Sequence, residues 1–367
     1  MDDARKTVDG IEAAQGNPAP EFRLSVIVPA RNEAASLGAC LDSLIVQSEL
    51  GFELGRQWEL IVVDDDSADA TREIANAAAA GHEGVEVLSA PPLDLTERGG
   101  FTGKTNACWF AAQRTRGAWL LFTDADTVHE RGDLSRAIHE AQKYDAALLS
   151  YSPRQIVTGF WQRAVMPLVF SELATAYPPK QVSSPGSSVA AANGQFLLVE
   201  RDAYFAVGGH RAIGKEILED VAFARAIKRA RYGIRFRHAP EALATRMYRT
   251  LPDMIEGWTK NLALLFSSPI LMAAMLMLQF LLFFSLPALA FTLPLLVAWQ
   301  RAAILVVWLR AAWGFYNRVS RSHFPGADVA ISILGVPLFS WLLLRSSLHL
   351  RVTKSVGWKA RTYPAGR

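Results

Sequence analysis

Short apolar runs alternate with amphipathic stretches along the first half of the chain. Runs rich in β-branched and aromatic residues predict strands at Leu24–Val28, Leu60–Val63, Val85–Leu88, Trp119–Thr123 and Ala146–Ser150. The stretches between them have helical spacing and predict helices over Glu33–Gln47, Asp69–Ala80 and Lys104–Arg116. This alternation implies crossover connections and a mostly parallel sheet in an α/β domain. Ligands of such sheets bind at the carboxyl ends of the strands.

The pattern is looser after Tyr151. Helical spacing returns over Trp161–Tyr177 and Glu216–Arg231, and a strand is predicted at Asn193–Val199. The stretch Pro178–Ser188 is rich in Pro, Ser and Gly, which favour turns. We expect it to be a mobile loop that can close over a site.

The last third of the chain contains three apolar stretches, Ile270–Leu286, Ala288–Leu309 and Val329–Leu344. A helix that crosses a membrane needs about 20 residues. The first two stretches meet this requirement if Pro287 marks their connection. The third is shorter, so we expect two crossings followed by a re-entrant or interfacial helix. A pair of buried helices in a soluble protein is the alternative.

Charge is distributed unevenly between the two parts of the chain. Residues 251–367 carry 11 basic and 3 acidic side chains, whereas residues 1–250 carry 27 and 32. A basic, apolar tail suggests anionic lipid headgroups as its neighbours, and we expect no nucleic-acid partner. Basic residues on both sides of the third stretch, among them Arg318 and Lys354, predict that both of its ends are cytoplasmic. Residues 1–22 are polar and do not resemble a secretory signal, so the α/β domain should face the cytoplasm.

The chain has two cysteines, Cys40 and Cys108, each inside a predicted helix. Two isolated cysteines argue against a disulfide framework and against a cysteine-based zinc site. We expect both to be small buried residues.

Asp124 and Asp126 follow the predicted strand Trp119–Thr123 directly. Two carboxylates one residue apart can share a hard divalent cation such as Mg²⁺ or Mn²⁺, and the cation can in turn neutralise a diphosphate. An Asp-x-Asp sequence is common, so the prediction depends on the other motifs at the same edge.

A second acidic cluster, Asp64–Asp66, follows the strand Leu60–Val63. A carboxylate there, most directly that of Asp65, can accept hydrogen bonds from a nucleotide base or ribose. Capping of the next helix by Ser67 or Asp69 is the alternative for those two residues.

Lys104 lies beside Gly103 at the start of a predicted helix. Backbone N–H groups and a cation at a helix amino terminus can bind phosphate, while an ordinary solvated lysine is the alternative. The spacing of a P-loop is absent, which argues against an ATPase. Later, Glu219 and Asp220 lie together on the predicted helix Glu216–Arg231. Because neighbouring residues point about 100° apart, one of them at most faces a reaction centre, and we favour Asp220 over the alternative of an ion pair.

Taken in order, the runs Val26–Glu33, Val62–Ser67, Asp124–Asp126 and Glu219–Asp220 resemble glycosyltransferase family 2, which has the Rossmann-like GT-A fold. The resemblance extends from Leu24 to about Asn261. It implies a nucleotide-sugar transferase with a nucleoside site, a divalent metal site and a catalytic base. The corresponding residues would be Pro29, Ala30, Arg31, Glu33 and Asp65 for the nucleoside, Lys104 and Asp124 for the rest of the donor, Asp124 and Asp126 for the metal, and Asp220 for the base.

Two positions depart from the family pattern. Asp66 stands where the family often has Gly, so the local turn is expected to differ. The stretch Glu256–Asn261 stands where membrane-bound relatives have Gln-x-x-Arg-Trp, and only a Trp and a later Lys remain, which argues for transfer of a single sugar. Trp258 would line an acceptor site or anchor at the membrane interface. The further candidates for contacts to acceptor or phosphate are Glu219, Gln195, Arg249 and Lys260.

The runs Tyr248–Thr250, Gly257–Asn261 and Gly357–Tyr363 resemble membrane glycosyltransferases associated with carotenoids and hopanoids. We therefore predict an inverting, metal-dependent transferase that moves one sugar from a nucleotide-diphosphate donor, with UDP-sugar favoured, to a lipid in the inner membrane. Alternatives are a polyprenyl-phosphate sugar transferase and a catalytically silent nucleotide-sugar binder; a dehydrogenase is disfavoured because the first strand lacks Gly-x-Gly-x-x-Gly.

The predicted domain boundaries follow these patterns. They are a flexible N-terminus (1–22), a GT-A domain (23–250), an interfacial amphipathic helix (251–268), a membrane region (269–350) and a basic cytoplasmic tail (351–367).

Overall fold

The computed structural model describes residues 21–47, 49–93, 100–293, 296–353, 355–358 and 361–364. Its centre is a seven-stranded sheet with the order β3-β2-β1-β4-β8-β6-β9. The strands are β1 (Phe22–Ala30), β2 (Trp58–Asp64), β3 (Val85–Ser89), β4 (Gly117–Phe122), β6 (Leu148–Ser152), β8 (Leu197–Glu200) and β9 (Ile234–His238). Most of the predicted N-terminal segment lies outside the described residues, as do Lys354 and parts of the predicted tail.

The sheet is mostly parallel, as the sequence predicts. Strand β1 pairs in parallel with β2 and β4, and β2 pairs in parallel with β3. Strand β8 is the exception, because it lies antiparallel between β4 and β6. The register pairs Ala30 with Asp64 and Ile27 with Phe122, so the strands β1, β2 and β4 end at the same edge.

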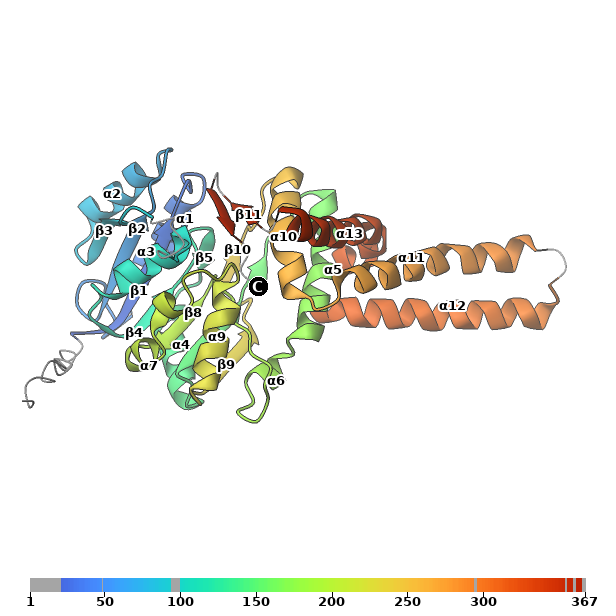
Figure 1. The fold of residues 1–367 in the computed structure, drawn as a ribbon. Coiled ribbons are helices and arrows are strands. Elements are labelled where there is room, and N and C mark those ends of the chain that lie inside the picture. Colours follow the sequence, from blue (N-terminus) through green and yellow to red (C-terminus); the bar gives the residue numbers. More distant parts are fainter. Residues whose placement is uncertain are drawn as a thin grey trace, which may run out of the picture.

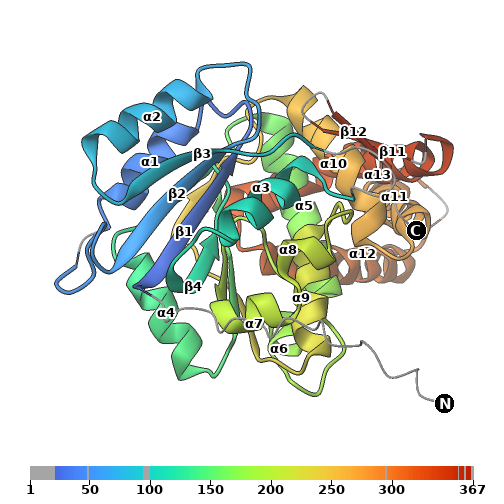
Figure 2. The ribbon, with the colours of Figure 1, turned by 60° about the vertical axis from the view of Figure 1, so that its left-hand side comes forward.

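Helices cover both faces of this sheet (Figure 2). One face packs against α1, α2 and α4, and the other against α3, α7 and α9. The helices of this domain are α1 (Leu37–Ile45), α2 (Thr71–Gly81), α3 (Gly103–Ala112), α4 (Asp133–Lys143), α5 (Phe160–Ala176), α6 (Pro179–Val182), α7 (Arg201–Ala206), α8 (Gly209–Ala212) and α9 (Glu219–Arg229).

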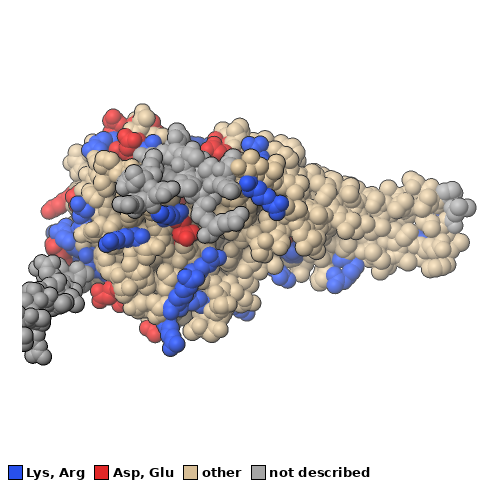
Figure 3. Space-filling model, in the orientation of Figure 1, with Lys and Arg blue, Asp and Glu red and all other residues tan. Residues whose placement is uncertain are grey.

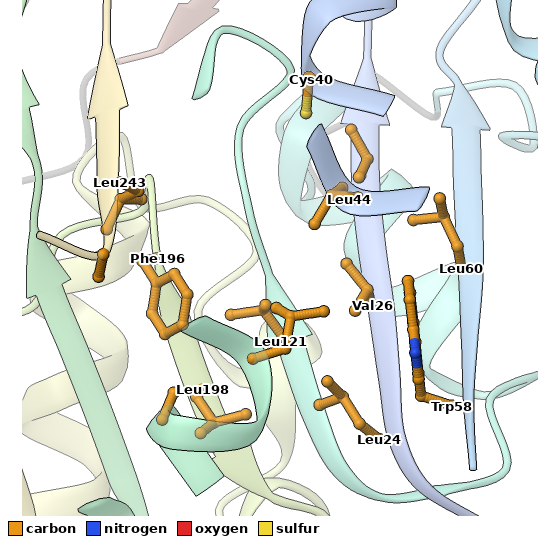
Figure 4. Packing of buried hydrophobic residues seen from close by; sticks show 14 of the residues in the cluster. Leu24, Val26, Cys40, Leu44, Trp58, Leu60, Leu121, Phe196, Leu198 and Leu243 are labelled. Atoms are coloured by element: carbon orange, nitrogen blue, oxygen red, sulfur yellow. The ribbon is translucent and has the colours of Figure 1, made fainter. Parts of the chain in front are cut away.

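Side chains of the central strands alternate between the two cores. Leu24 and Val26 of β1 pack with Leu60 of β2 and Leu121 of β4 on one face (Figure 4), whereas Ile27 points to the other core. Because both faces are covered, the strands are apolar at nearly every position, as expected for a buried parallel sheet. Cys40 and Cys108 are buried in α1 and α3, which confirms their predicted place.

Two small sheets accompany the main one. Strands β5 (Thr127–His129), β10 (Leu243–Thr245) and β7 (Arg154–Gln155) form the first, in the order β5-β10-β7. It joins the residues that follow β4 to the segment that enters the C-terminal helices. Strands β11 (Ser355–Trp358) and β12 (Arg361–Pro364) form a hairpin near the end of the chain.

Four long helices and a short 3-10 helix make up the remainder. They are α10 (Leu251–Leu265), α11 (Pro269–Thr292), α12 (Ala298–Val319), η1 (Ser320–Ser322) and α13 (Gly326–Thr353). Helices α11 and α12 extend away from the sheet domain side by side as a hairpin (Figure 1). In the view of Figure 3, acidic side chains gather on the sheet domain, whereas the surface of the hairpin is mostly uncharged.

The structure corrects the predicted boundaries of the apolar stretches. Pro287 does not mark a connection, because α11 continues through it to Thr292. The third stretch is also not a short element, since α13 is one helix of 28 residues that passes through Pro337. Proline is tolerated in such apolar helices, where neighbouring groups satisfy the freed carbonyl. Among the described residues, α11 and residues 326–352 of α13 are long and apolar enough to cross a membrane, while α12 does not qualify.

Two further predictions differ from the structure in detail. The predicted strand Asn193–Val199 begins only at Leu197, and the residues before it form a turn. The stretch Pro178–Ser188, expected to be a mobile loop, contains α6 and is attached to its surroundings. Lys228 donates hydrogen bonds to the carbonyls of Gln181 and Val182, at 3.2 and 2.8 Å.

Gly335 of α13 packs directly on α5. A Cβ atom at this position would lie 2.6 Å from the carbonyl carbon of Ala164, so Gly335→Ala should force the two helices apart. We expect a loss of about 1–3 kcal/mol in the free energy of unfolding. The matched control is Gly314→Ala in α12, where a Cβ would lie 3.6 Å from Arg310 and be accommodated. Thermal unfolding of both variants in the same detergent checks this, and equal midpoints would contradict it.

Candidate active site

A cavity of about 280 Å³ opens at the carboxyl edge of the main sheet. It collects residues from β1, α3, α9 and α10 and from the loops that follow β1, β2 and β4. The lining comprises Pro29, Ala30, Arg31, Glu33, Asp65, Thr102, Lys104, Asp124, Ala125, Asp126, Asn193, Gly194, Gln195, Ile217, Leu218, Glu219, Asp220, Met247, Tyr248, Lys260 and Asn261. The structure therefore brings together all the predicted site residues except Arg249 and Trp258.

Arg31 joins the loops that follow β1 and β2. Its guanidinium donates to the backbone carbonyls of Asp65 and Asp66, the latter at 2.8 Å. Asn32 strengthens the junction, because its side-chain oxygen accepts from the N–H of Ala68 at 2.9 Å. These bonds hold the buried Asp65 at the cavity wall.

Asp66 adopts the conformation that a glycine would take. Its φ is +57°, in the left-handed region where Asp and Asn are tolerated better than other non-glycine residues. Its side chain is 86% exposed, and its carboxylate lies 3.5 Å from the guanidinium of Arg31. The turn at Asp66 therefore has the left-handed conformation that a glycine would adopt freely.

We expect Asp66→Gly to fold normally and to bind donor as the wild type does, because glycine adopts this φ freely. Asp66→Val should destabilise the loop by roughly 1–2 kcal/mol, since a β-branched residue is strained there. Thermal unfolding and donor titration of the two variants test this. A normal midpoint for Asp66→Val would show that the loop does not require the left-handed conformation.

Lys104 connects carboxylates from two elements. Its Nζ lies 2.6 Å from Asp124 and 2.8 Å from Glu219, so it ties the end of β4 to the start of α9. Thr102 and Thr105 form a capping box that fixes the amino terminus of α3, from which Lys104 extends. Burial would lower the pKa of Lys104, but the two carboxylates raise it well above its usual value. The lysine is therefore a fixed cation at a helix amino terminus.

Asp220 has the properties of a base that is active near neutral pH. Its carboxylate accepts from the N–H groups of Gly194 and Val221, at 3.0 and 2.7 Å, which fix its orientation. Burial and the neighbouring charge of Glu219 raise its pKa to about 7. For Glu219, burial opposes ionisation but Lys104 outweighs it, and the pKa is lowered. The two adjacent acids thus differ in their surroundings. Glu219 is paired with Lys104, whereas Asp220 has no cation of the described residues at contact distance and is available for proton transfer.

Asp124 and Asp126 form a donor set that suits a hard divalent cation. The residues that the structure describes contain no group of three His, Cys, Asp or Glu side chains able to hold a metal alone. Two carboxylates with substrate phosphates are nevertheless a usual set for Mg²⁺. The ammonium of Lys104 already lies at contact distance from Asp124, so this carboxylate accepts a cation in the present geometry. The arrangement fits a metal that is completed by a diphosphate.

Some lining residues have no sequence signal of their own. Asn193 and Gly194 belong to the turn before β8, and Gly194 contributes through its backbone N–H.

Two predicted contact residues, Gln195 and Lys260, do line the cavity. The side-chain amide of Gln195 donates to Thr245 at 3.1 Å. Lys260 lines the cavity from α10, and burial lowers its pKa even though nearby carboxylates oppose this.

Two predicted contact residues lie elsewhere. Trp258 is buried in the core between α5, α10 and α13, where its indole N–H points to Met166 at 3.4 Å. It therefore neither lines the cavity nor anchors at a membrane interface. Arg249 is outside the lining and donates to the carbonyl of Ala35. The apolar face of α10 packs against α13.

A Rossmann-like sheet with these residues at its carboxyl edge is typical of glycosyltransferases. The family model described as "Glycosyl transferase family 2" matches residues 25–221, and the chain belongs to this family. A solved mannosyltransferase from Pyrobaculum calidifontis, in complex with GDP-Man and Mn²⁺, has a TM-score of 0.51 and 18% identity. The match covers 92% of this chain and 90% of that one. The GT-A prediction is confirmed.

Similar curated proteins are carotenoid-related. The 4,4'-diaponeurosporenoate glycosyltransferase of Staphylococcus haemolyticus (strain JCSC1435) is 29% identical over 93% of this chain and 88% of the relative. The protein of the same description from Staphylococcus aureus (strain USA300) is 29% identical over 65% of this chain, and the match spans 60% of its length. The predicted resemblance to carotenoid-associated glycosyltransferases is confirmed.

Proposed function

We propose that the chain transfers a single sugar from a nucleotide diphosphate sugar to a membrane lipid, with inversion at the anomeric carbon. One observation carries this proposal. A single cavity contains a nucleoside-side acid (Asp65), a pair of metal-type carboxylates (Asp124 and Asp126) and an acid with a pKa of about 7 (Asp220). Helix α10, which forms part of the cavity wall, packs against α13, one of the two helices among the described residues that are long and apolar enough to cross a membrane.

In this proposal the donor lies along the carboxyl edge of β1, β2 and β4. Asp65 and the residues Pro29–Glu33 hold the nucleoside, and Lys104 at the start of α3 faces the diphosphate. Asp124 and Asp126 would hold Mg²⁺ or Mn²⁺, which when bound supplies charge neutralisation of the leaving diphosphate. The Mn²⁺ and GDP-Man in the structurally similar Pyrobaculum protein support both assignments.

Asp220 acts on the acceptor. It takes the proton of the acceptor hydroxyl as that oxygen bonds to the anomeric carbon, while the bond from this carbon to the diphosphate oxygen breaks. Gly194 and Val221 orient the carboxylate through their N–H groups, which leaves its remaining lone pairs for the acceptor. An acceptor that is already ionised, such as a phosphate, would need less help from this base.

We place the sheet domain on the cytoplasmic side of the inner membrane and propose that α11 crosses the bilayer, with α12 returning beside it as the second arm of the hairpin. Leu271, Met275, Phe291 and Val306 are among the large apolar residues exposed on the hairpin. Arg318, at the end of α12 near the sheet domain, pairs with Glu172 of α5. Its place at the domain end is the one expected from the positive-inside rule.

The proposal is tested by mass spectrometry of lipids from cells that express wild-type protein or the Asp220→Asn variant. We expect a lipid with the mass of one added sugar in the first cells and its loss in the second. Purified protein, labelled UDP-sugar or GDP-sugar and the identified lipid should reproduce the transfer. A product that carries sugar on a soluble acceptor, with lipids unchanged, would overturn the lipid assignment.

A further inference from the structure

A long groove lies at the base of the α11–α12 hairpin. Its volume is about 1160 Å³, above the range of roughly 300–1,000 Å³ for small-molecule sites. Helices α5, α9, α10, α11 and α12 form its walls. The lining is mostly apolar and includes Leu265, Phe266, Met272, Met275, Leu276 and Leu282. An occupant of this groove would therefore be largely hydrocarbon.

The groove and the catalytic cavity share two helices. On α9, Asp220 lines the cavity and Arg225 lines the groove, five residues or about 7.5 Å further along the helix axis. On α10, Lys260 lines the cavity and Ala263 lines the groove. The Tyr177 hydroxyl donates to the carbonyl of Leu265 at 2.9 Å and fixes the end of α5 to the end of α10. Tyr177, which lines the groove, is also within electrostatic range of both Arg225 and Asp220, so the inner end of the groove is near the proposed base.

The outer side of the groove is the apolar face of α11. Leu271, Met275, Leu278 and Leu282 recur at helical spacing, so they form one stripe along this face. Their side chains are from 41% to 62% exposed. Such a continuous apolar stripe marks a contact surface, unlike single exposed leucines. Because the stripe belongs to the proposed membrane hairpin, a lipid can enter the groove from the bilayer.

Charged groups occur at defined places in the groove. Arg318 lies 3.3 Å from Glu172 and donates to Gln279 at 2.9 Å, so these three residues form one polar cluster in the groove. Arg225 forms no ion pair in the described part of the chain. It is the positive charge at the end nearest Asp220 and complements an anionic oxygen.

Resting on the proposed transfer to a lipid, we propose that this groove binds the hydrocarbon chain of the acceptor. The head group then reaches Asp220 past Tyr177, and Arg225 contacts an anionic oxygen of that head group. Arg225 is in this scheme a specificity-determining residue that favours acidic lipids over neutral ones. Carboxylates and phosphates both present such an anionic oxygen, so the test includes both.

The chain site is tested by photo-crosslinking of the full chain in nanodiscs with a diazirine-bearing C16 fatty acid. Ala176→Trp and Ala311→Trp fill the groove from exposed positions on its walls. We expect adducts on the groove face of α11 to fall by about tenfold in both variants, because the bulky ring displaces the chain. The matched control is Ala302→Trp, also exposed on α12 but outside the lining, which should label as the wild type does.

The head-group assignment is tested with three probes of equal chain length, a C16 carboxylic acid, hexadecyl phosphate and hexadecanol, each with the diazirine. Arg225→Gln should reduce labelling by the two acids and leave that by the alcohol unchanged, and Arg225→Lys should restore part of it. If Arg225→Gln reduces labelling by hexadecyl phosphate alone, the acceptor head group is assigned as a phosphate. If it reduces labelling by the carboxylic acid alone, the head group is assigned as a carboxylate. Equal losses with all three probes would overturn the role of Arg225.

Failure of the groove and failure of the proposed function give different results. If sugar transfer to lipid persists with normal KM in Ala176→Trp and Ala311→Trp, and adducts are unchanged, the groove assignment is wrong while the function stands. If adducts map to the groove but no lipid receives sugar, the proposed function is wrong and the lipid site remains. If a second copy of the chain covers the apolar stripe of α11 in a dimer and protects it from labelling by the probe, the assignment of the groove as a lipid site is also wrong.

Discussion

Asp126→Ala should reduce sugar transfer by about 10³-fold or more, because it removes one of the two carboxylates proposed to hold the divalent cation. The fold should survive the change. Thr245 donates to the backbone carbonyl of residue 126 at 3.2 Å, and this bond does not depend on the side chain. Transfer is measured with saturating Mn²⁺, and binding of Mn²⁺ in the presence of donor is followed by electron paramagnetic resonance.

The control for this experiment is Asp42→Ala, which removes an exposed carboxylate of α1 that is not part of the cavity lining. It should leave both transfer and Mn²⁺ binding unchanged. Wild-type transfer that survives complete removal of divalent ions would show that the reaction needs no metal, whatever the effect of Asp126→Ala.

Asp220→Asn should lower the rate of transfer by on the order of 10²- to 10⁴-fold, because an amide keeps the volume but cannot accept a proton. Donor binding should remain nearly intact. With a pKa of about 7, wild-type Asp220 is increasingly protonated as the pH falls below 7, so kcat/KM should decline about tenfold per pH unit there. The variant should lack this dependence. Rates are measured under single-turnover conditions so that the chemical step is observed.

The matched control for this prediction is Asp202→Asn, an exposed aspartate on α7. It should change neither the rate nor its pH dependence. A loss of less than about tenfold in Asp220→Asn, with chemistry limiting, would mean that another group removes the proton.

The sequence is sufficient to predict which edge of the sheet holds the site, because only the ends of the predicted strands are needed to locate that edge. Parallel strands end at one edge, so the acids that follow β2 and β4 necessarily meet there, and Asp65, Asp124 and Asp126 line one cavity. Asp220 lines the same cavity although it is nearly 100 residues further along the chain than Asp126. Its place in the site is predicted from the Glu219–Asp220 motif and not from the order of the strands.

Other parts of the site depend on contacts that a sequence pattern does not express. Trp258 follows a family motif position, yet α13 covers it and removes it from the cavity. Gly194 contributes only a backbone N–H, which every residue except proline possesses. Pro287 resembles a helix boundary, but in an apolar hairpin the helix passes through it.

Helix α10 belongs to the catalytic cavity and to the C-terminal helices at the same time. Lys260 and Asn261 form part of the cavity wall, while Met254 and Leu262 of the same helix pack in a core that includes Phe339 of α13. The sheet domain therefore cannot be separated from the C-terminal helices without opening the cavity wall that α10 forms. A detergent that loosens the packing of α13 on α10 would lower the activity while leaving the sheet domain folded. A loss of activity in detergent would then reflect this packing and not a change in the catalytic residues.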